Sequence, residues 1–290
     1  MGVAVSLIDV RDLVKTYDDK IVLNGFNLTI ERGETIVLIG GSGSGKSTFA
    51  RLLVGLERPD AGEIWIDGVD IARLGGRDLD RVRRKFAVVF QKYALLDSMS
   101  VLDNVAFPMR EETDLSATEI EKRVHLALRE LDVDDAAEKL PGQLSGGMAK
   151  RVGIARAVVT EPEILVYDEP TSGLDPVSSR VVDGLIERMR ERHSVTSIVI
   201  THDMATAFEV GDRVVLLADG KVVAQGSPEE LFRSHGEEIG KFAQSSGIDP
   251  ARLAPRTSRT SPAEIRARWD EAHPPVPDAP RGWSWPWQTP

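Results

Sequence analysis

The chain has 290 residues, with 36 basic and 46 acidic side chains and a formal net charge of −10. This acidic balance argues against a nucleic-acid partner, because neutralising phosphates requires clustered Lys and Arg. The chain contains no cysteine, which excludes disulfides, thiolate catalysis and cysteine-based zinc sites. No apolar run reaches the ~20 residues that span a bilayer, and Met1–Asp9 lacks a signal-peptide pattern. We therefore expect a soluble, cytoplasmic protein.

Residues 6–39 have the pattern of strands. Leu7–Val10 and Asn27–Ile30 alternate apolar and polar residues, as half-buried strands do. Ile36–Ile39 is a short continuous apolar run, which is typical of a buried strand.

A phosphate-binding loop follows this buried run. Gly40–Ser47 reads G-G-S-G-S-G-K-S and fits the G-x-x-x-x-G-K-[ST] pattern. The glycines let several backbone N–H groups point at one anion, and the helix that follows adds its positive end. Lys46 would reach the β- and γ-phosphates, and Ser47 would hold Mg²⁺. The predicted nucleotide contacts in this loop are Gly40, Gly41, Ser42, Gly43, Ser44, Gly45, Lys46, Ser47 and Thr48.

The middle of the chain alternates strands with a helical insert. Phe49–Leu56 has helical spacing, Ala61–Gly68 reads as a strand closed by an Asp-Gly turn, and Phe86–Phe90 is another apolar strand. From about residue 92 to residue 160 the pattern is mostly helical, giving an insert of roughly 70 residues within an α/β core. Ser116–Glu119 is a capping box that opens one of its helices.

Two carboxylates follow the next strand, Ile164–Tyr167. Asp168 stands where a carboxylate can reach Mg²⁺ through water, and Glu169 is placed to polarise an attacking water. Most Asp-Glu dipeptides simply lie at a surface turn and have no catalytic role. The phosphate loop in the same chain favours the catalytic interpretation.

The remaining pattern completes the core and then changes. Ile198–Ile200 reads as a buried strand, and a hairpin turns at Asp219-Gly220. From about Ser246 onward, 45 residues hold nine of the 16 prolines and four of the five tryptophans. This extension cannot build a core of its own, although Pro262–Glu271 can form a short helix. We divide the chain into a nucleotide-binding domain, residues 1–245, and a Pro- and Trp-rich extension, residues 246–290. For the extension we expect either docking on a partner or the second copy, or partial disorder.

Six motifs in order resemble the nucleotide-binding subunit of an ATP-binding-cassette (ABC) transporter over about residues 6–235. Besides the phosphate loop and the Asp168-Glu169 pair, four matches carry the resemblance. They are an aromatic residue that stacks on adenine, a glutamine that senses Mg²⁺ and water, a signature sequence with its D-loop, and a switch histidine that contacts the γ-phosphate. The matching residues are Tyr17; Gln91; Leu144, Ser145, Gly146, Gly147 and Met148 with Ser172–Asp175; and His202.

The resemblance implies an α/β P-loop NTPase with a RecA-like core, an antiparallel β subdomain and a helical subdomain. It implies ATP and Mg²⁺ as ligands, with Glu169, His202 and Gln91 catalytic, Ser47, Gln91 and Asp168 serving the metal, and Asp175 near the nucleotide. Two copies would close head to tail around two nucleotides. The fifth signature residue is Met148, where glutamine is common in the family; the backbone donors are unaffected by that difference.

Met148 and the stretch 90–111 further resemble the ATPase of Mla/Mce-type transporters, which move phospholipids or other hydrophobic molecules across a bacterial envelope. That resemblance implies an integral membrane permease, an MCE-type substrate protein and a STAS-domain regulator as partners. It places the subunit on the inner face of the cell membrane. An ABC ATPase for a polar solute, importing or exporting, and a soluble ABC ATPase outside transport remain the alternatives.

Overall fold

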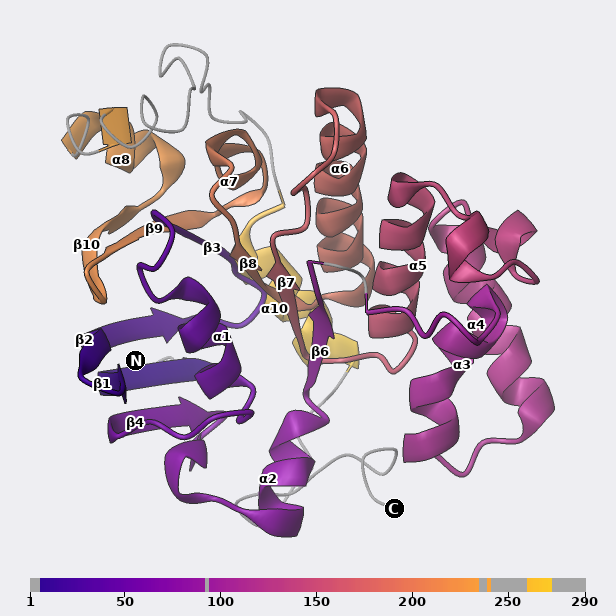
Figure 1. The fold of residues 1–290 in the computed structure, drawn as a ribbon, viewed down its shortest axis with the longest axis horizontal. Coiled ribbons are helices and arrows are strands. Elements are labelled where there is room, and N and C mark those ends of the chain that lie inside the picture. The colour runs from indigo at the N-terminus through magenta and orange to yellow at the C-terminus, as the bar shows by residue number, and fades with distance from the viewer. Residues whose placement is uncertain (1–5, 92–93, 235–238, 241–259, 273–290) are drawn as a thin grey trace.

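A computed structural model of the chain describes residues 6–91, 94–234, 239–240 and 260–272. Its strands form two sheets, and a group of three helices lies beside the larger one (Figure 1). This is the α/β arrangement that the sequence predicts, with a mainly parallel core, an antiparallel subdomain and a helical subdomain. Within the described ranges, no helix combines the length and apolar character needed to cross a membrane.

The larger sheet has six strands in the order β10-β9-β3-β8-β7-β6. Five of them are parallel, and only the β9–β10 hairpin is antiparallel. All residues of β3 and β8 are buried, as expected for parallel strands covered on both faces. The strand bounds are β3 Thr35–Ile39, β6 Phe86–Val89, β7 Ile164–Asp168, β8 Thr196–Ile200, β9 Arg213–Ala218 and β10 Lys221–Gly226.

The smaller sheet is antiparallel, with the order β2-β1-β4-β5. The expected Asp67-Gly68 turn joins β4 to β5, and both residues have positive φ angles. The first two strands are longer than their alternating cores suggested, because β-bulges carry the pairing on to Tyr17 and Lys20. The bounds are β1 Ile8–Tyr17, β2 Lys20–Ile30, β4 Ala61–Ile66 and β5 Val69–Asp70.

Serine caps begin all three helices of the helical subdomain. Ser100, Ser116 and Ser145 each accept a hydrogen bond from a backbone N–H in the first turn of the following helix. The α-helices are α1 Lys46–Leu53, α2 Gly76–Arg83, α3 Val101–Glu112, α4 Ala117–Glu130, α5 Gly146–Val158, α6 Pro176–His193, α7 Met204–Val210, α8 Pro228–Ser234 and α10 Pro262–Ala272. Short 3₁₀ turns span Ile71–Arg73, Asp134–Ala136 and Pro141–Gln143.

Helix α1 differs from its predicted range. It begins at Lys46, inside the phosphate loop, and ends at Leu53 rather than continuing to Leu56. Gly55 has a φ of 68°, a left-handed conformation that ends helices. The apolar spacing past that glycine is therefore not helical.

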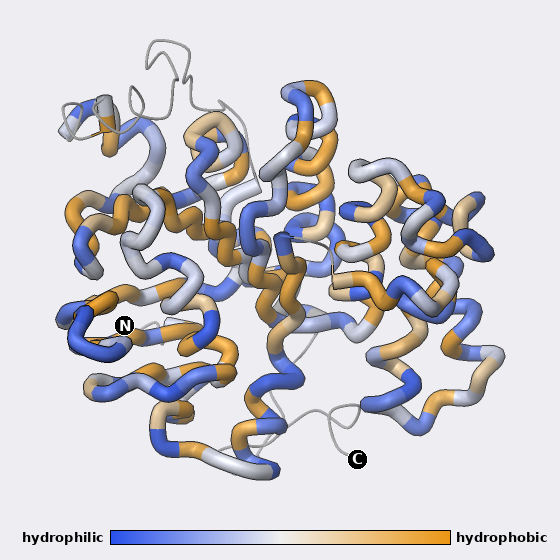
Figure 2. The backbone as a smooth tube through the Cα atoms, in the orientation of Figure 1, coloured by the Kyte–Doolittle hydropathy of each residue, from blue (hydrophilic) through white to orange (hydrophobic). Residues whose placement is uncertain are grey.

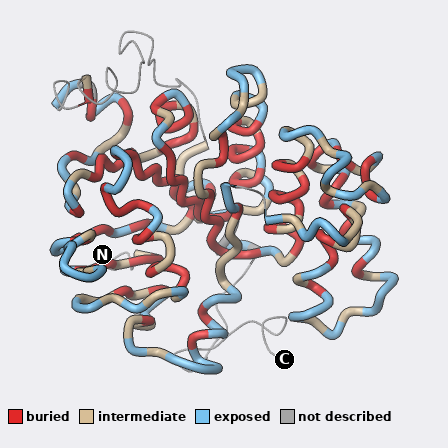
Figure 3. The backbone as a smooth tube through the Cα atoms, in the orientation of Figure 1, coloured by how far each residue is buried: buried red, intermediate tan, exposed pale blue. Residues whose placement is uncertain are grey.

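The parallel sheet separates two hydrophobic cores, and single strands contribute to both. In β3, Val37 and Ile39 join the core shared with the helical subdomain, whereas Ile36 and Leu38 join the core under the antiparallel sheet. The alternation follows from the two-residue side-chain period of a strand. The central strands are accordingly the most apolar and most deeply buried part of the fold (Figures 2 and 3).

Helix α10 forms where the sequence allows a helix in the extension, and it packs against Gly33 and helix α6 of the same chain. Ile265 is fully buried, and a Cβ at Gly33 would lie 2.7 Å from its Cγ2 atom. Thr260 and Arg268 donate hydrogen bonds to the side chain and the carbonyl of Glu191 on α6. The rest of the extension and the Trp269 side chain lie outside the described residues, so the division at residue 245 stays a prediction.

Candidate functional site

The phosphate loop joins β3 to α1 and depends on two close backbone approaches. A Cβ at Gly40 would lie 2.3 Å from the carbonyl oxygen of Leu217. A Cβ at Gly45 would lie 2.7 Å from Leu23, and Gly45 also has a φ of 109°. Only glycine fits both positions, so the loop can fold back and direct its N–H groups toward one anion.

Lys46 lies along this loop with its ammonium group turned back onto the backbone. Its Nζ donates hydrogen bonds to the carbonyl oxygens of Gly40, at 2.7 Å, and Gly41, at 3.0 Å. Burial lowers the pKa of Lys46, and the nearby Glu169 and Asp168 carboxylates oppose that effect. A buried cation held by neutral carbonyls is prepared to meet a more negative ligand.

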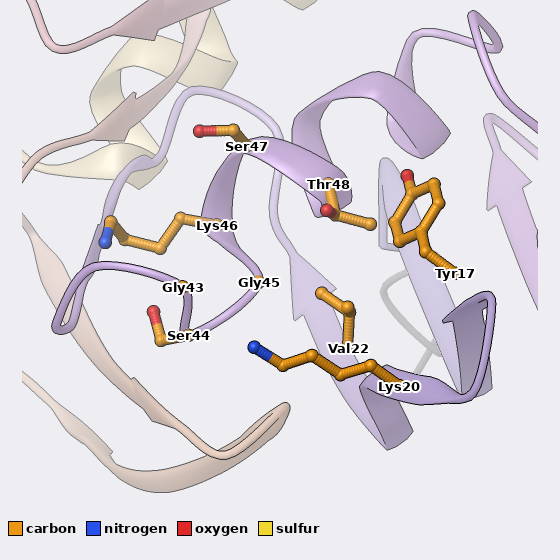
Figure 4. A pocket seen from close by; sticks show the side chains of 9 residues that line it. All are labelled: Tyr17, Lys20, Val22, Gly43, Ser44, Gly45, Lys46, Ser47 and Thr48. Carbon is orange, nitrogen blue, oxygen red and sulfur yellow. The ribbon is translucent and has the colours of Figure 1, made fainter.

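A cavity of about 250 Å³ opens beside the loop. Figure 4 shows Tyr17 at one end of it, with the Lys20 side chain reaching in from the start of β2. The Tyr17 hydroxyl bonds to Glu57, which leaves the ring at the cavity edge. Lys20 and Val22 were not predicted from the sequence, although their nearness to Tyr17 across a two-residue turn was a usable signal. The lining residues are Tyr17, Lys20, Val22 and Gly43–Thr48.

Parallel pairing of β7 with β8 brings Glu169 and His202 together. Asp168 pairs with Ile200, and the next residue, Glu169, donates its backbone N–H to the Ile200 carbonyl at 2.8 Å. The Glu169 carboxylate lies 2.8 Å from Nδ1 of His202. Glu169 also has a φ of 51°, a costly conformation for a non-glycine residue that is found disproportionately at functional sites.

Asp168 has the features of a residue that serves a metal. Burial and the repulsion of Glu169 raise its pKa, while Arg51 and Lys46 act in the opposite direction. Its Oδ1 atom is buried and has no hydrogen-bond partner among the described residues. In the same ranges no group of three or more His, Asp or Glu side chains could hold a metal by itself. Mg²⁺ that is shared with phosphate oxygens needs only one or two protein ligands, so Asp168 and Ser47 fit it.

Gln91 contacts the segment after Glu169. Its amide nitrogen donates to the Ser172 hydroxyl at 3.3 Å, and the residue itself is exposed. The structure thus brings Gln91 to the loop that follows the two carboxylates. Its expected contact with Mg²⁺ stays a prediction.

Three of the signature residues, Ser145, Gly146 and Gly147, line a separate cavity of about 500 Å³. Ser145 caps α5, and Asp175 caps α6 by accepting from the N–H groups of Val177 and Ser178. Two helix N-termini therefore face one cavity. The Met148 side chain is half buried and packs against the apolar core, whereas its backbone N–H donates to the Ser145 hydroxyl. The lining residues are Ser145, Gly146, Gly147, Arg151, Gly173, Leu174, Asp175, Ser178, Val181 and Val182, none of which lines the Lys46 cavity.

Residues 23–172, which are half of the chain, match the family model described as ABC transporter. The chain belongs to the ABC transporter family. It is an ATP-binding subunit, and its enzymatic activity is ATP hydrolysis coupled to transport.

Two curated relatives of this ABC cassette differ in the transport system that their names print. It is 38% identical over 248 residues to the intermembrane phospholipid transport system ATP-binding protein MlaF of Haemophilus influenzae, covering 86% of this chain and 94% of that protein. It is 40% identical over 238 residues to the methionine import ATP-binding protein MetN of Carboxydothermus hydrogenoformans, covering 81% of this chain and 70% of that protein. The similarity therefore shows the activity and leaves the cargo open.

The cassette also resembles solved structures of its family. A dimeric, post-hydrolysis structure of the ATP-binding cassette MJ0796, bound to ADP and Pi, is 33% identical, with a TM-score of 0.70. The match covers 76% of this chain and 98% of that one. The predicted P-loop NTPase architecture is thereby confirmed.

Proposed function

We propose that two copies of this cassette close head to tail around two ATP molecules. The observation that carries the proposal is that the Lys46 cavity and the Ser145 cavity have no lining residue in common. A nucleotide gripped by Lys46 then needs a second copy to present the α5 N-terminus to its γ-phosphate. The dimeric form of the similar cassette MJ0796 supports this arrangement.

Within each site we assign hydrolysis to Glu169. Its carboxylate would orient the attacking water and accept a proton from it, and His202 would hold that carboxylate and contact the γ-phosphate. Gln91 would sense the water and the metal. Mg²⁺, held by Ser47 and through water by Asp168, would neutralise charge on the β- and γ-phosphate oxygens. Tyr17 would stack on the adenine.

The cargo that we propose is a phospholipid or another hydrophobic molecule, moved across a bacterial envelope. The support is the printed function of the MlaF relatives together with the Met148 signature and the stretch 90–111. The MetN relative keeps a polar-solute transporter as the second candidate.

This function requires partners on the cytoplasmic face of the membrane. We propose an integral membrane permease, an MCE-type substrate protein and a STAS-domain regulator, with no nucleic acid. We further propose that the Pro- and Trp-rich extension, residues 246–290, docks on a partner or on the second copy. Deleting residues 273–290, which keeps α10, should weaken assembly with the permease, whereas unchanged assembly would contradict docking by that segment.

The test of the cargo is purification of the tagged cassette from its native membrane, with mass spectrometry of the proteins and lipids that accompany it. We expect a permease, a membrane-tethered lipid-binding protein and a phospholipid in stoichiometric amounts. A permease accompanied by a polar-solute-binding protein, without lipid enrichment, would favour the second candidate.

A further inference from the structure

The three residues after Glu169 are held by three separate elements of the fold. Their segment, Pro170–Ser172, connects the catalytic carboxylate to the start of α6. Gln91, which follows β6, donates to the Ser172 hydroxyl at 3.3 Å. The Thr171 and Thr206 hydroxyls lie 3.2 Å apart in a buried contact, and Thr206 is on the helix that begins just after His202.

The third hold comes from the signature helix. Lys150 lies in α5, five residues after Ser145, and only 3% of it is exposed. Its ammonium group donates hydrogen bonds to the carbonyl oxygen of Pro170 and, at 3.0 Å, to that of Ser172. These two acceptors bracket the segment, so a single cation fixes both of its ends.

Burying such a cation has a large desolvation cost. Burial lowers the pKa of Lys150 to about 8, and the Glu169 carboxylate partly offsets that effect. An apolar side chain of the same length would avoid the desolvation cost. The charge is therefore better explained by what it positions than by what it contributes to folding.

We propose that Lys150 is a positioning residue that holds Glu169 in register for hydrolysis through the Pro170–Ser172 segment. The inference rests on the proposed role of Glu169. In the proposed dimer, the N-terminus of α5 serves the nucleotide of the partner copy. Its Lys150 serves the carboxylate of its own copy, so each α5 helix contacts both ATP sites.

The first test is steady-state hydrolysis by Lys150→Met, which keeps the length of the side chain and removes its donors. We expect kcat to fall about 10²-fold, the cost of a small misplacement at a reacting centre, with KM for ATP changed less than about threefold. Lys150→Arg, which retains donors, should recover most of the loss. Lys122→Met, on the exposed face of α4, is the matched control and should behave as wild type.

The decisive test uses mixed dimers in which one copy carries Glu169→Gln, so that only the other copy's glutamate can act. Placing Lys150→Met in the copy with the intact Glu169 should abolish most of the remaining turnover. Placing it in the copy with Glu169→Gln should leave that turnover within about twofold. Equal losses in both arrangements, or the reverse order, would overturn the proposal.

The outcomes also separate this inference from the assignment of Glu169. If Glu169→Gln alone keeps full turnover, the proposed catalytic role is wrong. If Glu169→Gln abolishes turnover while Lys150→Met leaves kcat unchanged, the catalytic role stands and the role of Lys150 is wrong. Thermal melting of each variant shows whether the fold is retained.

Discussion

The two cavities of the cassette are built from different chemistry. The Lys46 cavity adjoins charged groups, including the half-buried Asp168 and Glu169, which act on the Lys46 ammonium. The Ser145 cavity is formed around two helix N-termini, and its carboxylate, Asp175, is occupied in capping one of them. The first has the groups for binding and hydrolysis, whereas the second can only present donors to an anion. In the proposed dimer, each copy would therefore supply the hydrolytic residues of one site and the helix N-termini that face the nucleotide of its partner.

The largest expected effect is on ATP hydrolysis, through Glu169 beside the Lys46 cavity. Glu169→Gln removes the proposed base, so kcat for phosphate release should fall about 10³-fold while ATP still binds. Glu161→Gln is a matched control, because Glu161 also has a positive φ but is exposed in the turn before β7. Loss of turnover in Glu161→Gln as well would point to a general disturbance of the fold.

ATP binding should depend strongly on Lys46 and only weakly on Lys20, the other lysine that lines the first cavity. Lys46→Ala removes a charged phosphate contact, which we expect to weaken ATP binding by about 2–3 kcal/mol, roughly 10²-fold. Lys20→Ala, on the exposed side of the same cavity, should cost about threefold or less. Equilibrium binding of a fluorescent ATP analogue measures both, and equal losses would contradict the central place of Lys46.

The second cavity should affect hydrolysis without affecting the first binding step. Ser145→Ala should lower kcat about tenfold and leave ATP binding to a single copy unchanged. Removing the cap also costs about 1 kcal/mol of stability. Ser116→Ala removes an equivalent cap from α4, so it should show the same loss of stability with a normal kcat. A normal kcat for Ser145→Ala would remove the second cavity from the reaction.

Two carboxyl groups with raised pKa values, Asp168 and Asp183, should respond differently to magnesium ATP. Burial, with repulsion from Asp203 and Glu209, raises the pKa of Asp183 to about 7, although the Thr206 hydrogen bond and Arg180 oppose this. The folded state then binds more protons than the unfolded state between pH 4 and 7. Stability from this group is present below pH 4 and is lost as the pH rises through 7.

The corresponding measurement is the melting temperature as a function of pH. Asp183→Asn should raise it by a few degrees above pH 7 and leave it unchanged near pH 4. Magnesium ATP should remove the pH dependence of the melting temperature that comes from Asp168, because a bound cation favours the charged form of that carboxylate. The pH dependence that comes from Asp183 should be unchanged. If magnesium ATP also changed the pH dependence that comes from Asp183, the surroundings of Asp183 and Asp168 would be coupled.

The smallest effect should follow from the unusual signature residue. Met148→Gln leaves the backbone donors of α5 in place, so kcat should stay within about threefold of wild type. Its half-buried position against the apolar core predicts a small loss of stability instead. A large loss of turnover would show that the Met148 side chain takes part in the cap.

The sequence predicted the parts of this fold that depend on local patterns. The glycine loop, the buried strands and the Ser116 cap each depend on a few adjacent residues. The contacts of Lys150 with Pro170 and Ser172, and of Ile265 with Gly33, join residues far apart in the chain. No local sequence pattern indicates such a contact, so it is seen only in the packing of the folded chain. The placement of Ser145 opposite a second copy's nucleotide came from the family resemblance.

The most direct test of the account is the structure of the Glu169→Gln variant saturated with ATP and Mg²⁺. We predict a dimer in which Lys46 of one copy and Ser145 of the other contact the same γ-phosphate at both sites. A dimer with nucleotide bound to Lys46 and no signature residue of the partner within hydrogen-bond distance of it would contradict the account.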